Sequence, residues 1–78
     1  MSRYFVLAYK RSEGGLVEVP YETDTLAEAS AQRERWERKY ATPNGDVEIP
    51  LLVASNLEVL KKTHGRYFKT LRELNVTG

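Results

Sequence analysis

The chain has 78 residues, of which 12 are lysine or arginine and 11 are aspartate or glutamate, for a formal net charge of +1. This near-neutral total argues against a general polyanion binder, and the absence of cysteine excludes disulfides, a thiolate nucleophile and a cysteine zinc site. A chain this short buries only a small core, so we expect one domain over residues 1 to 78 that gains stability by self-association.

The first apolar segment, Arg3-Tyr-Phe-Val-Leu-Ala-Tyr9, predicts a β-strand. It is apolar at both alternating positions, which is typical of a strand that is covered on both faces or lies centrally in its sheet. The run is shorter than a signal-peptide core, and Lys10 and Arg11 close it. We therefore expect a soluble, cytoplasmic protein without a membrane segment.

The next residues predict a hairpin. Residues 10 to 15 end in Gly14-Gly15, which suits a turn, and residues 16 to 21 form its second strand. Pro20 has no backbone donor, so this strand is expected at an edge or to end there.

A helix is predicted from Leu26 to about Tyr40, because Thr25-Leu-Ala-Glu28 fits a capping box. Its apolar stripe is Leu26, Ala29, Trp36 and Tyr40, with Arg33 between them. Residues 46 to 54 then return to a period of two, which predicts a third strand, and Pro50 inside it favours an edge position or a bulge.

A second helix is predicted after the capping box Ser55-Asn-Leu-Glu58. Apolar residues and His64 then recur at spacings of three and four as far as Leu74, which favours one continuous helix from Asn56 to about Leu74. In the alternative, Gly65 takes a left-handed conformation, the helix stops at His64, and Tyr67 and Phe68 fold back separately.

These elements predict an α+β fold of order β-β-α-β-α, with a three-stranded antiparallel sheet in strand order 2-1-3 and both helices packed on one face. The other face would then be open and apolar, which favours a homodimer. The interface candidates are Phe5, Tyr9, Val17, Val19 and Tyr21. In the alternative, one helix lies on each side and no face is open.

The C-terminal part of the chain is basic. Residues 61 to 78 have a net charge of +4 and residues 1 to 60 a net charge of −3. On the predicted helix the basic residues share an arc next to the apolar stripe and form a candidate nucleic-acid surface: Lys61, Lys62, Arg66, Lys69 and Arg72. Basic residues on the solvent side of an amphipathic helix are also what any soluble protein shows.

Other residues carry weaker signals. His64 is the only histidine and has no cysteine or second histidine to work with, so a half-buried, hydrogen-bonded position in the helix seam is favoured over catalysis. Asp46 and Glu48 point to the same side of a strand, but nothing else in the pattern converges on them as a cation site would need. We predict no catalytic residue, metal, cofactor or small-molecule substrate.

Two stretches, YFVLAYKRSEGGLV and LKKTHGRYF, resemble short bacterial proteins of unassigned function. These proteins combine a Tyr-x-Arg-x-x-Gly-like hairpin with a Thr-His-x-Arg-Tyr-Phe helix segment. The resemblance implies no activity and no site. The sequence therefore predicts a small non-enzymatic interaction module, homodimeric through its open sheet face, with a nucleic-acid-binding accessory protein as the alternative.

Overall fold

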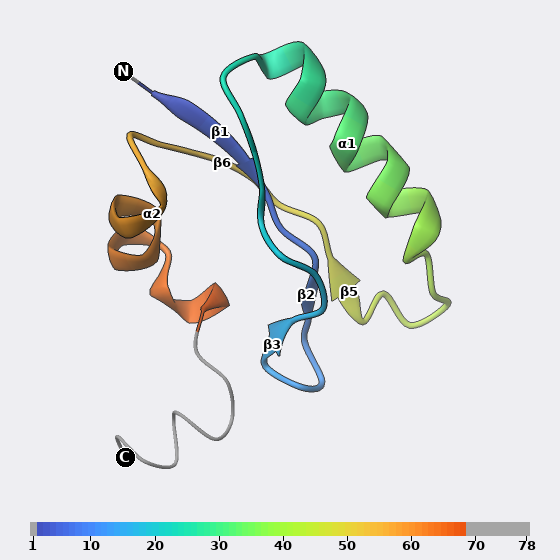
Figure 1. The fold of residues 1–78 in the computed structure, drawn as a ribbon. Coiled ribbons are helices and arrows are strands. Elements are labelled where there is room, and N and C mark those ends of the chain that lie inside the picture. Colours follow the sequence, from blue (N-terminus) through green and yellow to red (C-terminus); the bar gives the residue numbers. More distant parts are fainter. Residues whose placement is uncertain (1, 69–78) are drawn as a thin grey trace, which may run out of the picture.

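A computed structural model describes residues 2 to 68 as a small α+β fold with two helices and antiparallel strands (Figure 1). Within this range, no helix combines the length and apolar character that crossing a bilayer requires. The elements in chain order are β1 (Arg3–Val6), β2 (Tyr9–Lys10), β3 (Gly15–Leu16), β4 (Tyr21–Thr23), α1 (Leu26–Lys39), β5 (Val47–Glu48), β6 (Leu51–Ala54), α2 (Leu57–Thr63) and the 3₁₀ helix η1 (Gly65–Tyr67).

The strands form two three-stranded sheets, with orders β4-β1-β6 and β3-β2-β5, and every pair is antiparallel. The sequence predicted one sheet. The break falls at Leu7 and Ala8 of the central segment, where single hydrogen bonds replace the ladders: Leu7 N donates to Pro50 O at 3.1 Å, and Val17 N donates to Ala8 O at 2.8 Å. Proline lacks the donor that a ladder needs, and Pro20 and Pro50 both lie at this break.

The edge strand also carries extra residues at the break. Leu16 pairs with Tyr9 and Tyr21 pairs with Val6, so residues 17 to 20 lie opposite only Leu7 and Ala8. Extra residues in one strand of an antiparallel pair bulge away from the ladder. This bulge leaves Val19 85% exposed.

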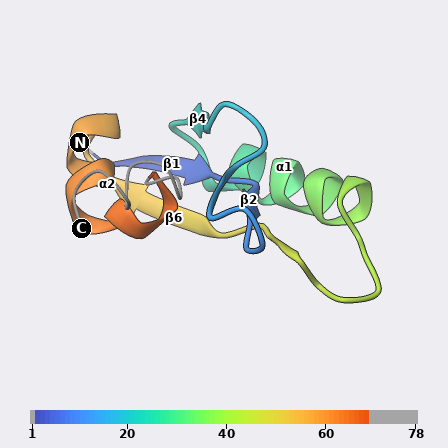
Figure 2. The same ribbon diagram turned by 90° about the horizontal axis from the view of Figure 1, so that it is seen from below.

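The two helices cover opposite faces of the strands, so the prediction that both lie on one face is wrong. Phe5, Val6, Leu7 and Ala8 are all 0% exposed. Because successive side chains of a strand point to opposite faces, four such residues in a row require cover on both sides. In Figures 1 and 2, α1 lies on one side of the strands, and α2 and η1 lie on the other.

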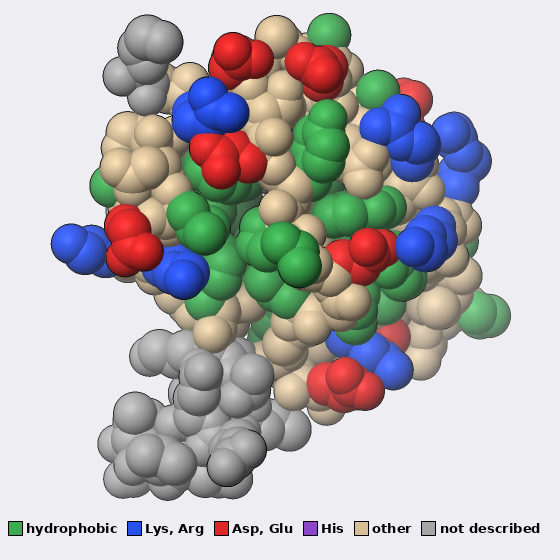
Figure 3. Space-filling view, in the orientation of Figure 1, with side chains coloured by type: hydrophobic (Ala, Val, Ile, Leu, Met, Phe, Trp, Pro, Cys, Tyr) green, Lys and Arg blue, Asp and Glu red, His purple; other side chains and the backbone are tan. Residues whose placement is uncertain are grey.

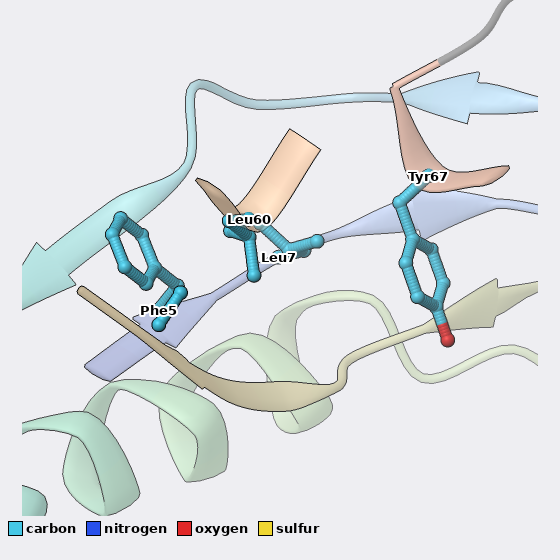
Figure 4. Close-up of a cluster of buried hydrophobic side chains, with 5 residues drawn as sticks. Phe5, Leu7, Leu60 and Tyr67 are labelled. Atoms are coloured by element: carbon cyan, nitrogen blue, oxygen red, sulfur yellow. The ribbon is translucent and has the colours of Figure 1, made fainter. Parts of the chain in front are cut away.

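Each helix has its own core cluster. Between α1 and the strands, Ala29 and Trp36 of the helix pack with Val6, Ala8 and Ile49. On the other face, Leu60 of α2 and Tyr67 of η1 pack with Phe5, Leu7 and Ala54. Figure 4 shows Phe5, Leu7, Leu60 and Tyr67 of the second cluster, with Leu60 close to Leu7, which lies between β1 and β2.

Helix α1 agrees with its prediction. Thr25 is the N-cap, and its hydroxyl oxygen accepts a hydrogen bond of 3.3 Å from the Glu28 backbone N–H. The Glu28 carboxylate accepts from the hydroxyl groups of Thr25 and Thr23. Arg33, which interrupts the apolar stripe, donates from Nε to Ile49 O at 3.1 Å. This bond connects the helix to the residues between β5 and β6. Leu26 is 53% exposed, so the predicted stripe is buried only from Ala29 onward.

Helix α2 is short, and the predicted continuous helix is wrong within the described residues. The N-cap is Asn56, one residue later than predicted, and the helix ends at Thr63. The chain then turns into η1 at Gly65, which is close to the alternative prediction, although the left-handed glycines among residues 2 to 68 are Gly14 and Gly45. The predicted stripe residues Leu71 and Leu74 lie outside the described residues.

The reason for this early end is tertiary packing. Leu60 and Tyr67 both belong to the cluster around Phe5 and Leu7, and Tyr67 is only 8% exposed. Its ring packs against Tyr9 of β2. The turn at His64 brings Tyr67 back onto the strands, and burial of this large ring outweighs the few helical hydrogen bonds that are lost.

Candidate anion-binding surface

The carboxylate of Glu48 is the centre of a cluster built from three separate parts of the chain. Its Oε1 accepts hydrogen bonds from Arg11 Nε at 3.4 Å and from Arg66 Nη2 at 3.3 Å. Its Oε2 accepts a hydrogen bond of 2.8 Å from the Tyr67 hydroxyl. Glu48 is positioned by its pairing with Tyr9 in the β2–β5 ladder, Arg11 follows β2 in the hairpin, and Arg66 and Tyr67 belong to η1.

Two aromatic rings hold the second arginine in place. The rings of Tyr9 and Tyr67 meet edge to face, with centroids 5.1 Å apart and planes at 87°. The guanidinium carbon of Arg66 lies 4.6 Å from the Tyr67 ring centroid and 6.0 Å from that of Tyr9. A cation over an aromatic face is stabilised by about 0.5–1 kcal/mol at an exposed site. The guanidinium therefore has a preferred place at the surface.

The cluster carries excess positive charge at the surface. The side chains of Arg11 and Arg66 are 60% and 66% exposed, whereas that of Glu48 is 25% exposed. Two guanidinium groups share one carboxylate at long hydrogen-bond distances, and each guanidinium has five N–H donors. Most of those donors point elsewhere than Glu48, so they are suited to bind the oxygens of a phosphate or carboxylate.

The Tyr67 hydroxyl is a fixed donor in this cluster. Burial, followed by the hydrogen bond to Glu48, raises the pKa of the Tyr67 phenol above its ordinary value. The phenol therefore stays protonated at neutral pH and holds one carboxylate oxygen of Glu48, while the other oxygen faces the two arginines.

Two exposed lysines lie on α2, the helix directly before η1. Lys61 and Lys62 are both exposed, although Glu58 on the same helix offsets part of their charge. In Figure 1, α2 and η1 follow one another on the side of the strands opposite α1, and η1 is the part nearer to the β2–β3 hairpin. We use the term basic surface for Arg11, Lys61, Lys62 and Arg66. Lys69 and Arg72, the other two predicted members, lie outside the described residues.

The five predicted interface residues do not form one surface. Phe5 is 0% exposed beneath α2, and Tyr9 is partly buried in the same cluster. Tyr21 is partly buried in the α1 cluster, on the opposite face. Val17 and Val19 are exposed, and both lie in the bulge between β3 and β4. The interface was inferred from an open sheet face, and this premise is wrong because each face carries a helix.

The other predicted polar residues have local partners. His64 caps α2, and its Nδ1 lies 2.9 Å from Thr63 Oγ1. The Asp46 carboxylate accepts hydrogen bonds from the backbone N–H and the hydroxyl of Ser12, at 2.9 Å and 2.7 Å. Over residues 2 to 68, His, Cys, Asp and Glu side chains do not gather in any group of three or more that would suit a metal ion.

Arg11 and Glu48 were not among the sequence candidates for this surface. Each is an ordinary charged residue in its local context, and only strand register brings both beside Arg66. Tyr9 and Arg11 lie in the stretch YFVLAYKRSEGGLV, and Arg66 and Tyr67 lie in LKKTHGRYF. The two stretches meet in the fold.

No protein-family model matches this sequence, and neither a curated protein nor a solved structure matches it.

Proposed function

We propose that this chain is a small, non-enzymatic interaction module that binds the phosphate backbone of a nucleic acid through its basic surface. The observation that carries the proposal is the convergence of Arg11 and Arg66 on one carboxylate, with both side chains more than half exposed. A structural ion pair needs one arginine, whereas a second exposed arginine at the same carboxylate adds positive charge that an anion is suited to neutralise.

The binding step follows from the geometry of the two arginines. A phosphate oxygen that approaches Arg11 and Arg66 accepts from N–H groups that the shared Oε1 of Glu48 leaves available. Tyr67 and Tyr9 keep Arg66 near the surface, which lowers the entropy lost when it binds. Lys61 and Lys62 add contacts to neighbouring phosphates. Contacts of this kind fix position and affinity and carry no base sequence information.

We further propose that the two sheets act as one bent layer, in which the three predicted strands take the order 2-1-3. In support, both sheets have the segment of residues 3 to 10 in the middle, and the hydrogen bonds of Leu7 and Ala8 join them across the break. Such a layer has one continuous face beneath α2 and η1. The hairpin arginine and the η1 arginine then belong to the same side of the molecule.

The test is a titration of fluorescein-labelled single-stranded RNA, single-stranded DNA and duplex DNA at two salt concentrations, followed by anisotropy. We expect affinity for at least one of them to fall as salt rises, because counterions are released on binding. The variant Arg11→Gln/Arg66→Gln should weaken binding about tenfold or more at low salt and flatten the salt dependence by about two counterions.

The matched control is Arg35→Gln/Arg38→Gln, which removes the same charge from exposed positions of α1 on the opposite side. The control should bind nearly as the parent chain does. Equal losses in the two double variants would mean that net charge alone drives binding, and no binding at low salt would reject the function.

A further inference from the structure

A groove of about 610 Å³ opens beside the C-terminal end of α1, and Tyr40 and Val47 in its wall pack with the α1 cluster. Its walls come from the end of α1, the loop that follows, β5, Lys10 of β2 and the bulge after β3. The apolar part consists of Val17, Tyr40, Pro43 and Val47. The volume is large enough for several aliphatic side chains or one small ligand.

A protruding apolar side chain stands on the same edge as this groove. Val17, in the groove wall, is 37% exposed, and Val19, two residues later, is 85% exposed. Val19 is the most exposed of the large hydrophobic side chains within residues 2 to 68. Figure 3, which looks onto the segment that joins β3 to β4, shows hydrophobic side chains gathered near the centre of the view, over this segment and between it and α1.

We infer that a second copy of this chain covers this face, with Val19 of each copy seated in the groove of the other. A two-fold dimer needs a surface that carries both the projecting group and its receptor, because the same patch serves both copies. The bulge and the groove meet this condition on one edge. The extra residues of the bulge are what carry Val19 away from its own strands.

The charges at the groove favour a second copy over a charged ligand. Lys39 Nζ lies 3.0 Å from Glu18, whose carboxylate also accepts from the Tyr40 hydroxyl, and Lys10 Nζ lies 3.4 Å from Glu13. Lys10 in the groove wall and Lys39 beside Tyr40 thus each have an acidic neighbour, so these cations do not repel their counterparts when two copies meet. A free organic anion would have to displace one of these acids.

This dimer is independent of nucleic-acid binding. Tyr40 and Val47 of the groove belong with the α1 cluster, whereas Arg66 and Tyr67 lie on the α2 side. Lys61, Lys62 and Arg66 of both copies therefore remain exposed when two copies join, and Arg11 lies next to the Lys10 wall of the groove. Failure of one proposal leaves the other unaffected.

The first test is sedimentation velocity of the full chain over a hundredfold range of concentration. We expect the average mass to rise from 9.0 kDa, the mass of one chain, toward twice that value. Val19→Asp should hold the mass at one chain. The matched control Val53→Asp, at a 51% exposed valine of β6 on the other edge of its sheet, should associate as the parent does.

The second test is a disulfide between copies, and it uses the fact that the chain has no cysteine. With oxidised glutathione as the oxidant, an equimolar mixture of Val19→Cys and Pro43→Cys should form the mixed disulfide at least tenfold faster than a mixture of Val53→Cys and Pro43→Cys. Circular dichroism of each variant checks that it is folded. A parent chain of constant single-chain mass, a Val19→Asp dimer as tight as that of Val53→Asp, or equal cross-linking rates would each overturn the inference.

Discussion

The hydroxyl of Tyr67 donates a hydrogen bond of 2.8 Å to Oε2 of Glu48, and this bond joins η1 to β5. It also fixes the carboxylate that two arginines share. One side chain thus serves the core, through its ring, and the surface, through its oxygen. Two substitutions at Tyr67 should separate these roles.

Tyr67→Phe removes the hydroxyl and keeps the ring. We expect a loss of about 1.5–3 kcal/mol in the free energy of unfolding, because one hydrogen bond to a partly buried charged acceptor is lost. Urea denaturation followed by circular dichroism measures it. Tyr67→Ala should cost about 3–5 kcal/mol, since it also empties the ring's place in the core. Equal costs for the two variants would contradict the separation of roles.

Stability should fall at alkaline pH, in part through Tyr67. Burial, and then the bond to Glu48, raises the pKa of its phenol in the folded chain above the ordinary value of 10.0. The folded state therefore favours the protonated phenol. The resulting stability is fully present below pH 10.0 and is lost as pH rises through the higher folded pKa.

The free energy of unfolding of the parent and of Tyr67→Phe, measured from pH 8 to pH 11.5, checks this. The variant should show a shallower decline. It should not be flat, because the hydrogen bond to Glu18 raises the pKa of Tyr40 in the same direction. Parallel curves for parent and variant would exclude Tyr67 as a source of the alkaline loss.

Acid should weaken the contact between the bulge and α1. The hydrogen bond from Tyr40, and then that from Lys39, lowers the pKa of Glu18 below its ordinary value of 4.5. A lowered carboxyl pKa gives stability that is present above pH 4.5 and is lost as pH falls through the folded pKa. Glu18→Gln should therefore flatten the decline below pH 4.5 in acid titrations of unfolding. Glu13→Gln, which removes the same charge from the adjoining hairpin, is the control.

Two glycines should respond oppositely to alanine. A Cβ added at Gly65 meets no atom within 4 Å and φ there is not positive, so Gly65→Ala should raise stability by about 0.4–1 kcal/mol by restricting the unfolded chain. Gly45 also has open space, but its φ is +62°, so Gly45→Ala should lower stability by about 1 kcal/mol or more. Thermal unfolding of both variants compares them. A stabilised Gly45→Ala would show that the left-handed turn is not required.

The sequence by itself determined the elements whose signals are local. Thr25 caps α1 because the pattern Thr25-Leu-Ala-Glu28 places a hydroxyl next to the N3 amide. A strand over residues 3 to 9 was predicted because residues 4 to 9 are apolar at both alternating positions, and the structure divides this segment into β1 and β2. Pro20 and Pro50 marked the interruptions of the two outer segments, since proline cannot donate to a ladder. Each of these needs only a few neighbouring residues.

Tertiary structure decided where α2 ends, which face each helix covers and which charges meet. The chain leaves the helix before Tyr67 because the Tyr67 ring is buried against Tyr9. The spacing of apolar residues along a helix does not predict a contact with a residue so far away in sequence. Phe5 and Val6 already indicated that both faces need cover, but the direction of the chain after β6 determined that α2 covers the face opposite α1. Arg11, Glu48 and Arg66 are far apart in sequence and meet only through strand register and this turn. Contacts of this kind depend on the closure of long loops, which a local pattern does not encode.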